Sequence, residues 1–103
     1  GDAFVWRHVD RVVAAGTTEQ HDIYEPLGEA GSADAHAAFL EHWQAAKRAY
    51  QDGDFGPALQ AFRSAVGVRS DDGPAHVFIA RCESFLHEGP PPGWDGAWRF
   101  DRK

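Results

Sequence analysis

The stretch Tyr50–Ala65, YQDGDFGPALQAFRSA, decides the fold that the sequence predicts. Gly53 favours the end of one helix, because glycine readily adopts the left-handed conformation found there, and Asp54 is a suitable cap for a second helix. The apolar residues of the second segment recur at helical spacing: Phe55, Ala58, Leu59, Phe62, Ala65 and Val66. The stretch therefore predicts a helical hairpin whose two arms pack through one apolar face.

The segments on either side of this helical hairpin also have helical spacing. Apolar residues repeat on one face in residues 35–51, and they do so again in residues 74–87. Asp72 stands just before the last of these segments, where its side chain is placed to cap a helix. We therefore expect antiparallel helices over residues 35–51, 55–68 and 74–87.

The helical hairpin resembles the tetratricopeptide repeat. The repeat has a pattern of Gly, Asp, aromatic, Ala, aromatic and Ala, which is matched by Gly53, Asp54, Phe55, Ala58, Phe62 and Ala65. The resemblance implies a concave, protein-binding groove lined by the first helix of each repeat, and it assigns to this groove Trp43, Lys47, Tyr50, Val77 and Arg81. The alternative is that Lys47 and Arg81 are solvated, or that they pair with Glu83 and with acidic residues near the C-terminus.

The N-terminal part of the chain predicts a β-hairpin. Residues 4–14 are rich in valine and aromatic residues, and a second extended run at 21–27 follows turn-forming residues around Gly16. Pro26 and Gly28 are expected to end the second strand. Because two strands alone are marginally stable in water, the hairpin is expected to rest either on the helices or on a sheet from elsewhere in the protein.

The hairpin sequence DRVVAAGTTEQHDIYEPLG, residues 10–28, resembles the last strand pair of class III adenylate and guanylate cyclase catalytic domains. That family commonly has an Asp, a valine strand, a turn with glycine, a Glu and a strand ending in Tyr-Glu. These features are matched by Asp10, Val12, Val13, Gly16, Glu19, Ile23, Tyr24 and Glu25. Ala15 and Thr17 stand where the family usually has lysines near the nucleotide phosphates, which argues against phosphate contact from this turn. The alternative is a β-hairpin with no cyclase ancestry.

The chain ends in a proline- and tryptophan-rich tail. Three consecutive prolines prevent a continued helix, and Trp94, Trp98 and Phe100 predict that the extended tail packs on the helices. The predicted fold class is mainly α, a three-helix tetratricopeptide-like module with an N-terminal β-hairpin and an extended Pro/Trp-rich tail. The expected segments are the hairpin at 1–28, a linker at 29–34 in which Ser32 or Asp34 caps the first helix, the helical module at 35–88 and the tail at 89–103.

Length and charge limit the function. A chain of 103 residues can hold one modest core, and its net charge of −6 argues against nucleic acid and anionic membranes as partners. No apolar run is long enough to cross a bilayer and no signal peptide is recognisable, so we expect a cytoplasmic location without direct membrane contact. The absence of methionine and the start at Gly1 indicate a piece of a longer protein.

Residues suited to catalysis or metal binding are sparse. The histidines lack the spacing of a helix-borne zinc site; they are His8, His21, His36, His42, His76 and His87. Cys82 lies between Phe78 and Phe85 at helical spacing, which favours a buried structural thiol over a nucleophile. No catalytic, cofactor-binding or metal-binding residue is therefore predicted.

The cyclase-like and helical segments together imply a function. They indicate a non-catalytic regulatory or protein-interaction module at the C-terminus of a bacterial adenylate or guanylate cyclase, a lyase of cyclic nucleotide signalling. The expected partner is a protein or peptide, including the parent's own catalytic domain, and strand exchange through the hairpin edge offers a route to a dimer. The alternative is a free-standing tetratricopeptide-like adaptor, unrelated to cyclases, that binds a peptide or protein.

Overall fold

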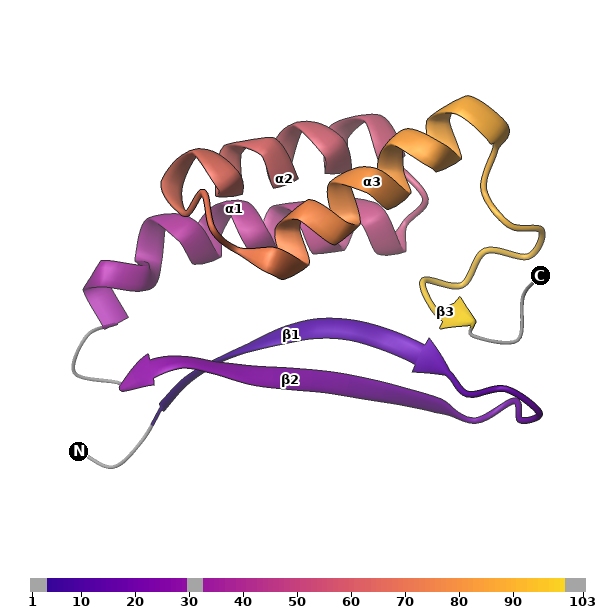
Figure 1. Ribbon diagram of the computed structural model, residues 1–103, viewed down its shortest axis with the longest axis horizontal. Coiled ribbons are helices and arrows are strands. Elements are labelled where there is room, and N and C mark those ends of the chain that lie inside the picture. Colours follow the sequence, from indigo (N-terminus) through magenta and orange to yellow (C-terminus); the bar gives the residue numbers. More distant parts are fainter. Residues whose placement is uncertain (1–3, 30–32, 100–103) are drawn as a thin grey trace.

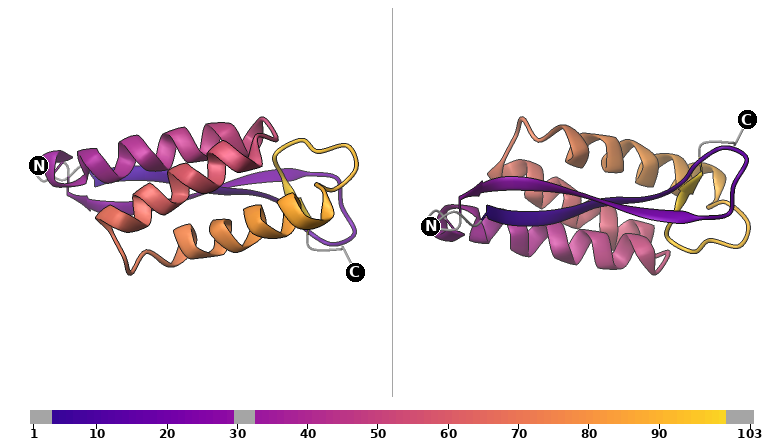
Figure 2. Two further views of the ribbon diagram at one scale, coloured as in Figure 1. Left: turned by 90° about the horizontal axis from the view of Figure 1, so that it is seen from above. Right: turned by 90° about the horizontal axis from the view of Figure 1, so that it is seen from below.

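The computed structural model describes residues 4–29 and 33–99, which form a helical layer and a sheet. The helices cover one face of the sheet (Figure 1). Seen from below, the β-hairpin runs along the helical layer between α1 and α3 (Figure 2). In chain order the elements are β1 (Phe4–Val13), β2 (Gln20–Glu29), α1 (Ala33–Gln51), α2 (Phe55–Val68), α3 (Gly73–Glu88) and β3 (Trp98–Arg99).

The sheet overturns the predicted fold class. In the described part of the chain its order is β2-β1-β3, with β1 antiparallel to β2 and parallel to β3. The tail is more than an extended segment, because Trp98 and Arg99 pair with Val12 and Val13 of β1. The prediction of a mainly α, tetratricopeptide-like fold is therefore wrong, and the described structure is a small α+β fold. The physical reason is that β1 packs under the helices and offers its second edge to the returning tail.

The turn between α1 and α2 forms as its residues predict. Gly53 has a φ of +83° and follows the end of α1. Its N–H donates to the Tyr50 carbonyl at 3.1 Å, and the Asp54 N–H donates to the Ala49 carbonyl at 2.8 Å. This pair of hydrogen bonds is the Schellman arrangement, which requires a residue with positive φ. Glycine at this position therefore fixes the reversal of the chain between α1 and α2.

The predicted caps have different outcomes. The Asp54 side chain makes no capping hydrogen bond to α2, so that prediction is wrong. The Asp72 side chain does cap α3, where it accepts from the Ala75 N–H at 3.1 Å. Ser32 lies outside the described residues, as does the side chain of Asp34. The predicted cap of α3 is therefore confirmed.

β2 extends further than predicted. It continues through Pro26 and Gly28 to Glu29, with Pro26 opposite Trp6 of β1. Proline lacks a backbone N–H, and it is tolerated here because β2 is the outer strand of the order β2-β1-β3. The expectation that Pro26 ends the strand is therefore wrong.

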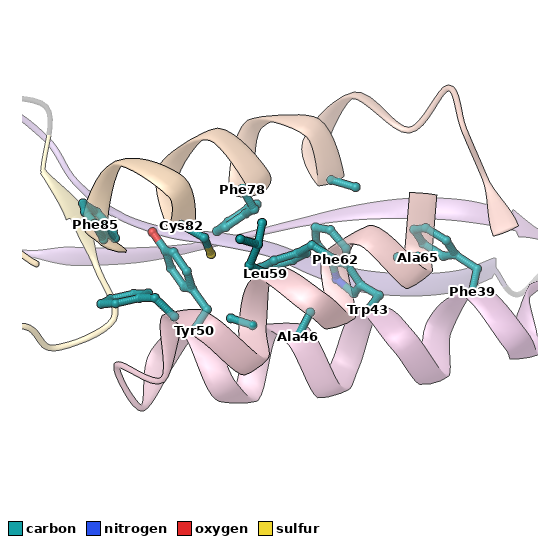
Figure 3. Packing of buried hydrophobic residues seen from close by; sticks show 13 residues of the cluster. Phe39, Trp43, Ala46, Tyr50, Leu59, Phe62, Ala65, Phe78, Cys82 and Phe85 are labelled. Atoms are coloured by element: carbon teal, nitrogen blue, oxygen red, sulfur yellow. The ribbon is translucent and has the colours of Figure 1, made fainter. Parts of the chain in front are cut away.

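Aromatic side chains from α1, α2 and α3 meet in the core (Figure 3). Phe62 stacks on Phe78 with ring centroids 5.1 Å apart, and both Trp43 and Tyr50 meet Phe78 edge-on, at 5.7 and 4.8 Å. Ala58 is fully buried, and its small side chain lets the backbones of neighbouring helices approach closely. The groups that bind the hairpin are therefore held on a rigidly packed layer.

The described part of the tail packs on the end of the helical layer through Trp94. Its indole N–H donates to the Tyr50 carbonyl at 3.0 Å. Its ring meets those of Tyr50, Phe55 and Phe85 edge-on, with centroids 5.1 to 5.4 Å apart. Phe100, which was expected to join this contact, lies outside the described residues.

We expect Trp94→Ala to lower the free energy of unfolding by about 2 kcal/mol, because it removes a partly buried ring and a hydrogen bond. Urea unfolding followed by circular dichroism measures the loss. Leu86→Ala is the matched control, since Leu86 is a half-exposed apolar residue of α3, and we expect a change within about 0.5 kcal/mol. Equal, small effects of the two substitutions would contradict the docking of the tail.

Candidate functional site: the contact between the helices and the hairpin

The residues predicted to line a protein-binding groove are mostly covered in the structure. Trp43, Lys47 and Tyr50 of α1 are 1, 6 and 0 % exposed. Arg81 of α3 points its guanidinium toward β1, whereas Val77 is half exposed. Trp43 and Lys47 bind the backbone of β1, and Tyr50 lies under Trp94 of the tail. The chain's own strand therefore occupies the face that was expected to receive a partner.

α1 donates two side-chain hydrogen bonds to the backbone of β1. The register between β1 and β2 shifts between His8 and Asp10, which leaves Val9 without a partner on β2. At this bulge the Trp43 indole N–H donates to the His8 carbonyl at 3.0 Å, and the Lys47 ammonium donates to the Val9 carbonyl at 2.8 Å. A buried carbonyl without a donor costs about 1 to 3 kcal/mol, so these helix side chains stabilise an interrupted ladder.

Arg81 joins α3 to β1 and to the tail. Its Nη1 donates to Oδ2 of Asp10 at 3.0 Å, and the side chains of the pair are only 12 and 11 % exposed. The guanidinium lies between two rings, 4.7 Å from the centroid of Phe78 and 4.0 Å from that of Trp98. Cation–π contacts of this kind strengthen when water is excluded. Arg81 thus holds β1 and the tail against the same helix.

A second ion pair, between Arg7 and Asp72, was missed by the reasoning from sequence. Arg7 of β1 donates to both carboxylate oxygens of Asp72 at 2.9 and 2.8 Å, and its side chain is 1 % exposed. It also pairs with Glu25 of β2, and its guanidinium lies 4.5 Å from the centroid of the Trp43 ring. Since Asp72 also caps α3, one carboxylate both starts that helix and holds the hairpin. The signal in the sequence was an arginine within an apolar strand.

Burial changes the acid–base chemistry of Lys47. It lowers the pKa of the ammonium from its ordinary 10.5 to about 8, although the carboxylate of Asp10 acts in the opposite direction. The ammonium also lies 4.2 Å from the centroid of the Phe78 ring, which favours the charged form. Lys47 therefore remains mostly protonated at neutral pH, and it loses its proton within the mildly alkaline range.

We expect the Lys47 contribution to stability to increase as the pH rises from about 8. The folded chain releases this proton near pH 8 and the unfolded chain near pH 10.5, so the unfolded state holds more protons in between and the free energy of unfolding rises. Comparing wild type with Lys47→Met between pH 8 and 9 isolates the effect, because both proteins contain every other ionisable group and the contributions of those groups cancel. Arg48→Met is the control. Parallel pH profiles of wild type and Lys47→Met would contradict the pKa shift.

Two other buried groups are shifted toward their neutral forms. Burial raises the pKa of the Cys82 thiol to about 11 and that of the Tyr50 hydroxyl to about 12. Cys82 is fully buried and is not part of a disulfide. A protonated, buried thiol is a poor nucleophile, so Cys82 acts as a core residue.

Comparisons with known proteins do not identify the site, so it is described by its contacts. No family model, no curated protein and no solved structure matches the chain. Among residues 4–29 and 33–99, no helix has both the length and the apolarity to cross a membrane, and no three His, Cys, Asp or Glu side chains are grouped to hold a metal ion. The site is a helical face whose side chains bind the backbone of a β-hairpin and form buried ion pairs with it.

Proposed function

We propose that the chain is a non-catalytic interaction module at the C-terminus of an adenylate or guanylate cyclase. In this proposal the helical layer holds the last strand pair of the catalytic domain, so the partner is the parent's own catalytic domain. The observation that carries the proposal is that Trp43, Lys47 and Arg81 all bind β1, the first strand of the hairpin whose sequence resembles that strand pair.

The contacts suit a module that fixes the position of the hairpin. Arg7 and Asp10 lie at different places along β1. Arg7 binds the carboxylate of Asp72, the cap of α3, and Asp10 binds the guanidinium of Arg81 in α3; both pairs are shielded from water. Ion pairs shielded from water cost far more to break by removing one partner than exposed ones do. Since a slip of one residue would turn both side chains to the other face, the helices select one register of the hairpin.

The hairpin also has surface with which to meet a further domain. Its exposed large apolar side chains are Phe4, Trp6, Ile23 and Tyr24. Exposed apolar residues gathered on one element are typical of interaction surfaces. Among the described strands, β2 pairs with β1 alone, so its outer edge is open to a further strand. In the proposal the outer edge of β2 and the exposed side chains of Phe4 and Ile23 adjoin the rest of the catalytic domain.

The proposal assigns the chemistry to the parent. Cyclization of ATP needs metal ions held by carboxylates and a cation near the developing phosphate charge. In the cyclase family these groups lie on elements that precede the closing strand pair. The chain itself is therefore proposed to make no cyclic nucleotide, and it is proposed to act in the cytoplasm, where ATP is available.

The first test is the coding sequence that precedes Gly1. The proposal requires paired aspartates on predicted strands and a helix with an Asn-x-x-x-Arg pattern, and an upstream sequence without them would refute it. In the parent protein, Arg81→Gln is then expected to lower cyclic nucleotide synthesis by roughly fivefold or more, the usual range for energetic coupling between sites. Arg63→Gln, on the exposed surface of α2, is the matched control and is expected to leave synthesis unchanged.

The competing function is a free-standing adaptor that binds a peptide in the groove. It would require β1 to leave Trp43 and Lys47, so peptide binding would be accompanied by exposure of the hairpin. Retention of a lysate protein by wild type and its loss in Trp43→Ala, with no cyclase sequence upstream, would favour the adaptor. The covered groove favours the cyclase module.

A further inference from the structure

A cavity opens beside the contact just described, between α1 and the hairpin. Its volume is about 400 Å³, and its lining residues come from β1, β2 and α1. Small-molecule sites in proteins usually enclose about 300 to 1,000 Å³, so the cavity has the size of such a site. We propose that it binds a small anion that carries a planar ring, a function that goes beyond holding the hairpin.

The cavity is positively charged although the chain is acidic. Arg11 of β1 and Lys47 and Arg48 of α1 line it, whereas the net charge of the chain is −6. The carboxylate in the lining, Asp22, is already engaged: it accepts from Arg11 Nε at 3.0 Å, and a ring nitrogen of His8 lies 2.9 Å from the same oxygen. A site of this charge attracts an anion and repels a cation.

Donors in the cavity remain available to a ligand. Lys47 donates to the Val9 carbonyl, which leaves further ammonium protons to donate. Arg48 is exposed and forms no ion pair with any described residue. Gln44 lies one turn before Arg48 on the same face of α1 and also lines the cavity. α1 therefore presents a row of donors for an anionic group, and ionised donors make the strongest hydrogen bonds to anions.

Ring surface is provided by the opposite wall. Trp6 and Tyr24 of the hairpin line the cavity and are 56 and 58 % exposed. Exposed aromatic faces next to cations suit a planar ring whose anionic group reaches the donors of α1. An anion without a ring would meet only the cations and other donors of the cavity, and an uncharged ring would meet only the aromatic side chains of the hairpin. Ring and anion in one molecule use both.

Titration of the full 103-residue chain tests the proposal, with adenosine monophosphate as a probe that joins a planar ring to a phosphate. Adenosine and inorganic phosphate are the separate parts. Amide and indole NMR shifts follow binding at pH 7. We expect the monophosphate to bind at least about tenfold more tightly than either part, the factor that one charge-assisted hydrogen bond provides. The shifts should gather in β1, β2 and α1. Equal affinities of the three probes would overturn the proposal.

Variants at exposed positions separate this site from general charge effects. Arg48→Glu and Trp6→Ala are expected to weaken binding of the monophosphate by about tenfold each. Arg63→Glu makes the same change of charge on α2, outside the cavity, and is expected to leave binding unchanged. Circular dichroism confirms that each variant is folded before titration. Equal weakening by Arg48→Glu and Arg63→Glu would show nonspecific attraction and would overturn the proposal.

Discussion

Asp72→Ala is expected to lower the free energy of unfolding by about 3 to 5 kcal/mol, because it leaves the buried Arg7 guanidinium without its closest buried partner. The substitution also removes the cap of α3, which is worth about 1 kcal/mol. Glu25 still pairs with Arg7, but it is partly exposed and pairs from the other side. Urea unfolding followed by far-ultraviolet circular dichroism measures the change.

Two further variants divide this effect into its parts. Asp72→Asn keeps a good capping residue and removes the charge, so it should recover only about 1 kcal/mol relative to Asp72→Ala. Asp71→Ala is the matched control, since it removes the same group from the neighbouring exposed position and should change stability by less than about 0.5 kcal/mol. Similar effects of Asp71→Ala and Asp72→Ala would show that the buried ion pair contributes nothing.

Trp43→Ala is expected to cost about 3 to 5 kcal/mol, the usual loss when a buried aromatic side chain is deleted. Trp43 packs against Phe62 and Phe78, and its indole N–H also satisfies the His8 carbonyl. The substitution therefore opens a cavity between the helices and removes a donor from the bulge of β1. Thermal and urea unfolding measure the loss.

The control for this prediction is Trp6, an exposed tryptophan of the hairpin. Trp6→Ala is expected to change the free energy of unfolding by less than about 1 kcal/mol, because Trp6 is mainly exposed. Trp43→Phe keeps much of the packing and removes the indole N–H, so it should fall between the two. If Trp43→Ala cost no more than Trp6→Ala, the placement of Trp43 under β1 would be wrong.

Features set by neighbouring residues could be predicted from the sequence. The apolar repeat gave α2 at the residues where the structure has it, Phe55–Val68, and Gly53 marked the reversal before it. Asp72 was recognised as a cap because capping depends on residues within one turn. Local pattern is sufficient for such features, since their partners lie within a few positions along the chain.

Features set by distant partners could not be predicted in the same way. Arg7 and Asp72 are 65 positions apart, and no local pattern joins them. β3 is only two residues long, too short for alternation to be visible, so the parallel pairing of the tail was missed. The bulge at Val9 has no sequence signature, although it explains why α1 donates to β1.

The face of α1 that was predicted to line a groove shows a third kind of feature that the sequence could not predict. Trp43 and Lys47 have the spacing of residues that line a groove, and the same spacing serves equally well to bury a strand. The sequence could place these side chains on one face of α1, but it could not say whether that face meets solvent, a partner or the chain's own hairpin. In the structure Trp43 and Lys47 are only 1 and 6 % exposed, which decides in favour of the hairpin.

The contact between the helical face and the chain's own β1 strand is tested most directly at the Trp43 indole proton. In nuclear Overhauser spectra of the 103-residue chain, we expect this proton to show contacts to the α-protons of His8 and Val9, since the indole nitrogen lies 3.0 Å from the His8 carbonyl oxygen. We also expect its exchange with water to be slow, because Trp43 is buried. Rapid exchange, with contacts only to residues of α1, α2 and α3, would show that β1 does not lie on the helical face.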